Sequence, residues 1–438
     1  MKNHMVDSKK CDELCTCGNR HTPPEVEVCL SEDAYSVLAA DCKKAVNNAS
    51  VLLIEDENTH FAAGTRVLEF LQKNSVKCKS VKLPSHTKVT DKLAEQIYKE
   101  SLEHALIIAV GAGAINDLGK YAASKRNMPY WAVPTAPSMN GYTSAIAAVT
   151  VEGVKRTLPA TPPRYIYVDP DVIHHAPLRL RQSGFCDLLA KSVSDFDWKT
   201  ESLLFGGSYC DLPSAIVSES ESSYIDHPEK IRQGDEKTVT ALSEGLLISG
   251  IAMTLAGSSA PASGGEHLIS HFLDMRESLT KREPDLHGLQ VGLGVVFSAL
   301  CYQKLASLKE KDLKNAAENI FQADADMIPR VWDNLAPDVE KQFFKKRTHL
   351  LELDRLLPKN WQALRALFSK VRKPDFFIDL IRRTGFEFTL KSLNLTKDEF
   401  LLAALSARTI RERITVLDIS AHAGILKDAA EETLEMLE

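Results

Sequence analysis

The chain has 438 residues, more than one average domain, and its 44 % hydrophobic content is ordinary for a packed water-soluble protein, so two domains are expected. The formal net charge of −6 at pH 7, without a dense basic run, excludes a general attraction to nucleic acid or to anionic membranes. The polar first residues and the absence of an uninterrupted apolar segment of about 18 residues predict a cytoplasmic protein without membrane insertion.

The nine cysteines are an odd number and most are scattered singly, which favours reduced thiols over a disulfide framework. Cys11, Cys15 and Cys17, followed by Gly18 and His21, could form a metal knuckle. Zinc sites usually show a second ligand pair nearby, and none follows here. The segment is therefore interpreted as a flexible or interfacial N-terminal extension over residues 1–34.

Short apolar runs alternate with helical patterns before residue 175. The expected strands are 50–56, 76–83, 105–110 and 130–134, and the expected helices are 65–73, 91–101 and 115–126. Strands interleaved with helices of this length indicate a parallel sheet covered on both faces. Residues 35–175 are accordingly predicted to form an α/β domain.

Long amphipathic helices replace the strands after residue 175. They are expected at 238–256, 289–308, 361–371 and 397–417, within a helical domain over 176–438. The proline-rich stretch 159–170 is where the chain is expected to pass between the domains.

Gly111, Ala112 and Gly113 form a tight turn between the expected strand 105–110 and the following helix. Such a turn lets backbone N–H groups approach a pyrophosphate at a positive helix N-terminus. The motif is not the full G-x-G-x-x-G fingerprint, so a plain strand-to-helix connection remains the alternative. Asp56, at the end of the first expected strand, could accept hydrogen bonds from a ribose or could cap the next helix.

His267 and His271 lie four residues apart and therefore on one face of a helix, and His287 begins a second helix rich in glycine. Two imidazoles and one carboxylate make a catalytic metal site with open positions. Asp187 is the best candidate for the carboxylate, because it is an acid on an otherwise apolar helix. Asp195 and Asp197 are interpreted as solvated charges.

The chain resembles the sn-glycerol-1-phosphate dehydrogenases, relatives of glycerol dehydrogenase, iron-type alcohol dehydrogenases and 3-dehydroquinate synthase. The resemblance covers about residues 35–425 and is densest at 115–120, 133–144, 184–187 and 265–271. It implies an α/β Rossmann-like N-terminal domain and an all-α C-terminal domain, the dehydroquinate synthase-like architecture.

By position, the resemblance implies Asp187, His267 and His287 as ligands of one divalent metal, zinc or alternatively nickel or iron, and His271 as the catalytic histidine. It implies NAD(H) or NADP(H) as cofactor, and His271, Asn140 and Asp187 beside the substrate. The implied cofactor-binding residues are Asp56, Gly111, Ala112, Gly113, Ala114, Ile115, Asp117, Thr135, Ser138 and Ser144.

Two positions depart from the family pattern. Ala112 replaces a glycine, which a backbone cradle tolerates if its φ stays negative. Asn140 stands where many relatives have an aspartate that contacts substrate hydroxyls, and the loss of charge suits an anionic substrate. Lys155 or Arg156 could anchor a phosphate, or could simply be charges at the tip of a hairpin.

The predicted reaction is the reversible reduction of dihydroxyacetone phosphate to sn-glycerol 1-phosphate. The substrate is a small phosphorylated ketone or triol, and the family implies polar lipid headgroup synthesis and a homo-oligomer, a dimer or larger. The alternatives are a glycerol or polyol dehydrogenase, a dehydroquinate-synthase-like cyclase, and a non-catalytic binding protein on the same fold.

Overall fold

The computed structural model describes residues 3–6, 9, 11–12, 15, 17–313 and 316–438. The chain divides into two compact units. The first unit contains residues 1–188 and 211–258, and the second contains 189–210 and 259–438. The domain division expected from the sequence remains a prediction.

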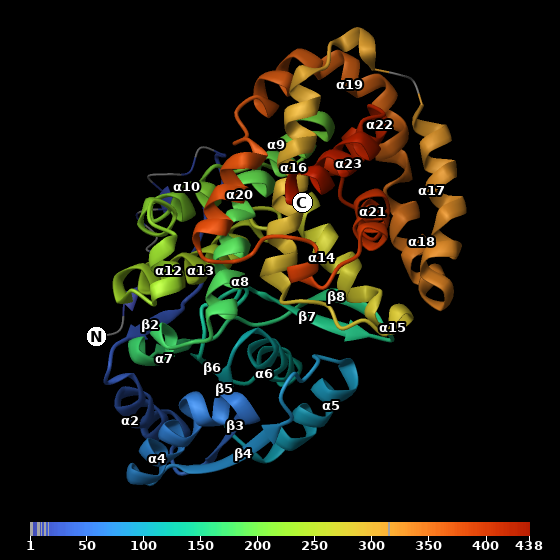
Figure 1. The fold of residues 1–438 in the computed structure, drawn as a ribbon. Coiled ribbons are helices and arrows are strands. Elements are labelled where there is room, and N and C mark those ends of the chain that lie inside the picture. Colours follow the sequence, from blue (N-terminus) through green and yellow to red (C-terminus); the bar gives the residue numbers. More distant parts are fainter. Residues whose placement is uncertain (1–2, 7–8, 10, 13–14, 16, 314–315) are drawn as a thin grey trace. The chain divides into compact units, whose positions relative to one another are not determined.

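A seven-stranded sheet with the order β1-β2-β9-β6-β5-β3-β4 forms the centre of the first unit (Figure 1). All neighbouring strands are parallel except for the antiparallel pair of β1 and β2. The strands are β1 (Asn3–His4), β2 (Glu27–Leu30), β3 (Ser50–Asp56), β4 (Lys77–Leu83), β5 (Leu106–Gly111), β6 (Tyr130–Pro134) and β9 (Tyr165–Val168).

Helices cover both faces of this sheet, as parallel strands require. Alternate residues of β3 point to opposite faces, so Leu52 and Ile54 share one core cluster while Val51 and Leu53 share another. The first cluster includes α5 (Asp91–Glu100) and α6 (Gly113–Arg126), and the second includes α2 (Ala34–Val46) and α4 (Thr65–Lys73). The α/β class expected from the sequence is confirmed.

Two parts of this unit differ from the sequence-based expectation. Residues 165–168, within the proline-rich stretch expected to link domains, form β9 between β2 and β6. Residues 146–159 form a separate antiparallel hairpin of β7 (Ile146–Val151) and β8 (Val154–Pro159). Further α-helices among the described residues of the unit are α3 (Glu57–Thr59), α7 (Pro170–His174), α8 (Leu178–Leu189), α10 (Leu212–Ser218), α11 (Ser222–Ile225), α12 (Glu229–Gln233) and α13 (Glu236–Ala256).

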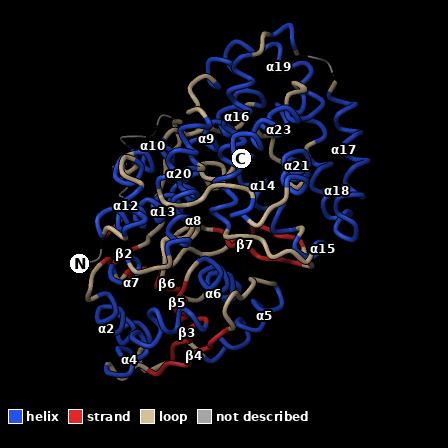
Figure 2. The backbone as a smooth tube through the Cα atoms, in the orientation of Figure 1, coloured by secondary structure: helices blue, strands red, loops and turns tan. Residues whose placement is uncertain are grey.

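The second unit consists of helices and connecting loops, with no strand among its described residues, and the strands coloured in Figure 2 all belong to the first unit. Its core helix is α16 (His287–Ser307), which packs against α14 (Gly265–Met275), α19 (Arg347–Phe368), α20 (Pro374–Arg383) and α23 (Leu426–Leu437). Further α-helices of this unit are α9 (Lys191–Phe205), α15 (Glu277–Thr280), α17 (Ala317–Trp332), α18 (Ala336–Lys345), α21 (Lys397–Ser406) and α22 (Val416–His422).

Two helix expectations are wrong at their boundaries. The helix expected at 361–371 is the end of the longer α19, and the one expected at 397–417 is interrupted between α21 and α22. Thr415 and Asp418 form a capping box that starts α22, which is why the helical pattern does not run through.

Helices α13 and α16 are long and apolar enough to cross a membrane. Their most apolar windows are 72 % and 83 % buried inside the protein, as in the core helices of water-soluble proteins.

Candidate functional site

The glycine turn connects β5 directly to α6, as the sequence predicts. Ala112 is the N-cap residue of α6 with φ −90°, and no side chain caps the helix at that position. A Cβ atom on Gly111 would lie 2.7 Å from the Cβ of Ile115, so only glycine allows the strand and helix to meet this closely. The helix N-terminus therefore offers backbone N–H groups to an anion.

The loop after β6 lies beside this turn, because Gly111 and Pro134 are paired at the carboxyl ends of neighbouring strands. Thr135 donates its backbone N–H to the Gly111 carbonyl across 3.3 Å. Ser138 and Ser144 are buried in the same loop, whereas the Ser144 hydroxyl is already engaged with the carbonyls of Gly141 and Ile146.

Lys120 organises this loop from within the protein, a role that sequence reasoning missed. Its fully buried ammonium donates to the Gly141 carbonyl at 2.7 Å and to the Ser144 hydroxyl at 3.2 Å. Burial lowers the pKa of Lys120, and the neighbouring Asp117 opposes that shift. The signal in the sequence was a lysine within the helix that begins directly after the glycine turn.

Asp117 and Asp56 both have local structural partners. Asp117 accepts the Ala148 N–H at 3.0 Å, which ties α6 to the β7–β8 hairpin. Asp56 forms a capping box with Thr59, accepting its N–H at 2.8 Å. The capping interpretation of Asp56 is thus what the structure shows, and its contact with a ribose, like the contact of Asp117 with the cofactor, remains a prediction.

Asp187 is buried on α8 and reaches the loop after β6. Its Oδ2 atom accepts the backbone N–H of Asn140 at 2.8 Å. A Cβ on Gly184, one turn earlier, would lie 2.0 Å from the Pro137 carbonyl, so this glycine permits the close approach. The side-chain Nδ2 of Asn140 is buried and has no hydrogen-bond acceptor among the described residues.

Three imidazoles gather in the second unit at the start of α14 and α16. The ring of His287 lies 5.2 Å from that of His267 and 5.6 Å from that of His271, between centroids. Ligand nitrogens of His267 and His287 lie within 4.8 Å of each other. The sequence-predicted histidines therefore converge, as a shared ion requires.

Each of the two expected ligand histidines is oriented by a partner at Nδ1. Glu266 Oε1 accepts the His267 Nδ1–H at 2.8 Å. The Ser270 hydroxyl lies 2.8 Å from His287 Nδ1 and donates to the His287 carbonyl at 3.4 Å. These contacts favour the tautomer in which Nε2 carries the lone pair, as metal-binding histidines need.

His271 has a different neighbour. The Arg411 guanidinium lies 3.3 Å from its Nδ1. Because arginine can only donate, Nδ1 accepts and the ring proton of the neutral imidazole is on Nε2. Arg411 was missed in the sequence because it lies 140 positions away.

The interpretation of Asp195 and Asp197 as solvated charges is wrong. Both side chains are buried, and Asp197 accepts the N–H groups of Gly265 and Val416, each at 2.7 Å. Burial and the nearby Glu266 raise the pKa of Asp197 to about 7. The carboxylate thereby fixes the N-terminus of α14, two residues before His267.

Lys155 and Arg156 lie on β8 of the hairpin, paired with Thr150 and Val149, and both are half-buried. They are therefore strand residues instead of charges at the tip, which is formed by Glu152 and Gly153. The role of Lys155 as a phosphate anchor remains a prediction.

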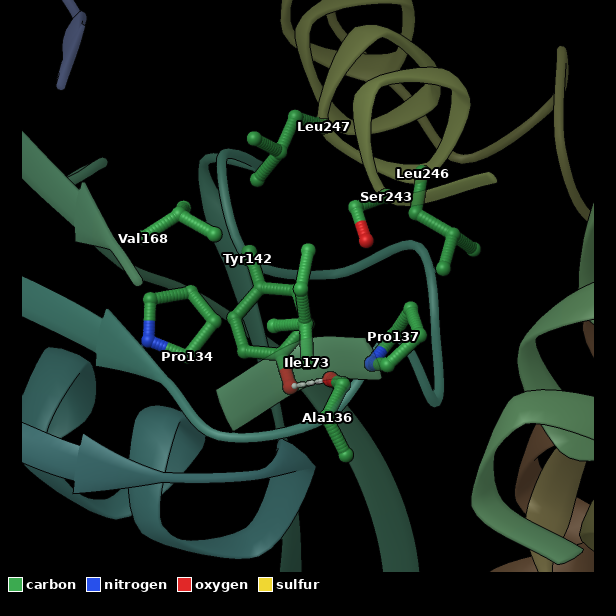
Figure 3. A pocket seen from close by; sticks show the side chains of 9 residues that line it. All are labelled: Pro134, Ala136, Pro137, Tyr142, Val168, Ile173, Ser243, Leu246 and Leu247. Atoms are coloured by element: carbon green, nitrogen blue, oxygen red, sulfur yellow. Dashed lines mark hydrogen bonds between the residues drawn. The ribbon is translucent and has the colours of Figure 1, made fainter. Parts of the chain in front are cut away.

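Figure 3 shows an apolar pocket on the inner side of the loop after β6. Two of its lining residues are hydrogen-bonded to each other, because the Tyr142 hydroxyl donates to the Ala136 carbonyl at 2.8 Å. The pocket suits packing of the loop and does not suit a charged dinucleotide. It is lined by Pro134, Ala136, Pro137, Tyr142, Val168, Ile173, Ser243, Leu246 and Leu247.

Comparisons with known proteins agree with these features. Residues 30–177 match the family described as iron-containing alcohol dehydrogenase. A protein of Bacillus subtilis (strain 168) named glycerol-1-phosphate dehydrogenase [NAD(P)+] is 36 % identical over 299 residues, 66 % of this chain and 75 % of the relative. A protein of the same name from Bacillus velezensis is 34 % identical over 66 % of this chain and 77 % of its own length.

Among solved structures, glycerol dehydrogenase from Schizosaccharomyces pombe superposes with a TM-score of 0.61 and 16 % identity. The superposition covers 95 % of this chain and 92 % of that one. At this identity the likeness concerns the fold, and the expected arrangement of an α/β part followed by a helical part is confirmed.

Proposed function

The chain belongs to the glycerol-1-phosphate dehydrogenase family, and from this premise we propose that it is an NAD(P)-dependent oxidoreductase that interconverts dihydroxyacetone phosphate and sn-glycerol 1-phosphate. The observation that carries the proposal is the gathering of His267, His271 and His287, two of them oriented through Nδ1 for metal binding.

The proposed metal ligands are Asp187, His267 and His287. A buried carboxylate and two imidazoles whose Nε2 atoms carry lone pairs match a catalytic site with open positions. Zinc accepts this donor set, and nickel or iron would accept it too. When bound, a divalent ion polarises the substrate oxygen and NAD(P)H supplies the hydride.

The turn after β5 is proposed to hold the dinucleotide pyrophosphate at the N-terminus of α6. Asp56, at the end of β3, is proposed to face the adenosine ribose through the carboxylate oxygen that its cap does not use. The other proposed contacts are Gly111, Ala112, Gly113, Ala114, Ile115, Asp117, Thr135, Ser138 and Ser144.

His271 is proposed to exchange the proton with the substrate oxygen. The arginine at Nδ1 places the ring proton on Nε2, where His271 donates a hydrogen bond to the substrate oxygen. As that proton passes to the oxygen during ketone reduction, a proton from solvent replaces it on the ring, and the reverse reaction returns one proton to solvent. Arg411 thereby positions His271.

Asn140 is proposed to contact the substrate. Its buried Nδ2 donor has no acceptor among the described residues, and an oxygen of the substrate would satisfy it. An amide at this position also adds no negative charge against a phosphorylated ligand. Lys155 is proposed as the phosphate anchor.

The test is oxidation of NADH and NADPH by metal-reconstituted enzyme with dihydroxyacetone phosphate, followed by the chirality of the product. The proposal predicts sn-glycerol 1-phosphate. Turnover of only unphosphorylated glycerol would favour a polyol dehydrogenase, and phosphate release without net cofactor oxidation would favour a cyclase. Asp187→Asn and His267→Ala should lose the metal proposed at this site, together with turnover, while the fold persists.

The cellular setting completes the proposal. We expect a cytoplasmic homo-oligomer that serves polar lipid headgroup synthesis, with no nucleic-acid partner, in keeping with the net charge of −6. Size measurements in solution and cell fractionation test these expectations.

A further inference from the structure

We propose that Cys15, Cys17 and His21 bind a zinc ion that is separate from the catalytic metal and serves a structural purpose. The three side chains lie close to one another in the first unit. The sequence shows no second ligand pair near these residues, whereas the structure brings their donor atoms together and orients the imidazole.

The donor atoms already lie at the separations that one ion imposes. Cys15 Sγ is 3.3 Å from Cys17 Sγ, and Cys17 Sγ is 3.1 Å from His21 Nε2. Ligands of a tetrahedral zinc, with bonds of about 2.0 to 2.3 Å, lie about 3.3 to 3.8 Å apart. The distances between these donor atoms therefore need to increase by only a few tenths of an ångström to hold the ion.

The orientation of His21 is a second, independent observation. Its Nδ1 lies 3.3 Å from the Leu255 carbonyl near the end of α13, and a carbonyl can only accept. Nδ1 is therefore the protonated nitrogen, and the Nε2 that faces Cys17 carries the lone pair. A backbone carbonyl at one nitrogen and the metal at the other is the usual arrangement of a zinc-bound histidine.

The backbone around Cys17 supports a thiolate. Gly18 has φ +77°, and this turn brings the Asn19 N–H to 3.5 Å from Cys17 Sγ. An N–H directed at sulfur stabilises its negative charge. Two thiolates would neutralise a divalent ion, and His21 would connect the N-terminal segment to α13 through Leu255.

Cobalt substitution tests the proposal on the full-length enzyme, since cobalt bound to thiolate has a near-ultraviolet charge-transfer band. The proposed catalytic ligands contain no sulfur, so this band reports only on the second site. We expect the band in the wild type and in Asp187→Asn, and its loss in the double variant Cys15→Ser, Cys17→Ser. Zinc content should fall from two ions per chain to one in the double variant.

Cys78→Ser is the matched control, because Cys78 is also half-buried in the first unit but lies on β4. It should keep both the band and two zinc ions. The double variant should retain dehydrogenase activity, which shows that it folds. A wild type without the band, a band that survives the double substitution, or a Cys15–Cys17 disulfide without metal would overturn the proposal.

The cobalt result is independent of the proposed function. If the catalytic assignment is wrong, the enzyme should show no turnover and no ion at Asp187. If only the second site is wrong, turnover and that ion should both be present, and only the sulfur-derived band should be missing.

Discussion

Asn140 donates its backbone N–H to Asp187 Oδ2 across 2.8 Å, and the same residue holds a buried side-chain amide donor without an acceptor among the described residues. The loop after β6 and helix α8 thus join the residue that carries this unsatisfied donor to the carboxylate that we assign to the metal. This arrangement connects substrate recognition to the metal ligand.

Replacing Asn140 with aspartate should weaken use of the phosphorylated substrate. A second carboxylate beside Asp187 adds like charge in a buried place and repels a phosphate-bearing ligand. We expect kcat/KM for dihydroxyacetone phosphate to fall about tenfold, equivalent to about 1.4 kcal/mol. Kinetics with dihydroxyacetone, which lacks the phosphate, should show a smaller loss; an equal loss for both would contradict a charge effect.

Removing the Ser270 hydroxyl should weaken the metal site without unfolding the second unit. Ser270→Ala leaves His287 Nδ1 without its neighbour at 2.8 Å, and losses of this kind typically cost about 10- to 100-fold in metal affinity. Chelator competition measures the change. Ser307→Ala, at the exposed end of α16, is the control and should bind metal like the wild type. Unchanged affinity in Ser270→Ala would refute the orienting role.

Lys120 should prove essential for the shape of the cofactor loop. Lys120→Met leaves the Gly141 carbonyl without its buried ammonium donor, and we expect a destabilisation of about 2–3 kcal/mol and a raised KM for the dinucleotide. Thermal unfolding and cofactor kinetics measure both. Lys125→Met, on the same helix but in a partly exposed pair with Glu95, should change little. Similar effects in the two variants would speak against a positioning role.

The buried Asp197 predicts a pH dependence of stability. Its folded pKa of about 7 exceeds the unfolded value of 3.8, so the folded state binds the proton more tightly than the unfolded state. Stability from this group is therefore greatest at low pH and is lost as pH rises from about 4 to about 7.

Asp197→Asn should remove that slope, although it costs stability at every pH because its amide must face a backbone N–H. Thermal midpoints of the metal-free proteins from pH 4 to pH 8 measure the difference. Parallel curves for the wild type and the variant would contradict the assignment.

The sequence predicted the central part of the fold well because local signals are strong there. Strands β3 and β6 begin and end where their apolar runs do, and α4 matches the expected helix. Strands β2 and β9 have only four residues each, and they form because β2 pairs with its neighbour β9, which in turn pairs with β6. No local pattern reveals such pairing.

The histidines of the site could likewise be predicted from the sequence, but several of the residues that orient them could not. His267 and His271 are neighbours on a helix by spacing alone. Asp197 becomes buried because the starts of two distant helices direct their N–H groups at it, and Arg411 reaches His271 from a segment far along the chain. Both depend on tertiary packing.

The most direct test of the account is anomalous X-ray diffraction from crystals of the zinc-loaded enzyme at the zinc absorption edge. We predict a peak bonded to an Asp187 oxygen and to Nε2 of His267 and His287, at about 2.0–2.2 Å. An active enzyme whose crystals show no ion bound to these three residues would contradict it.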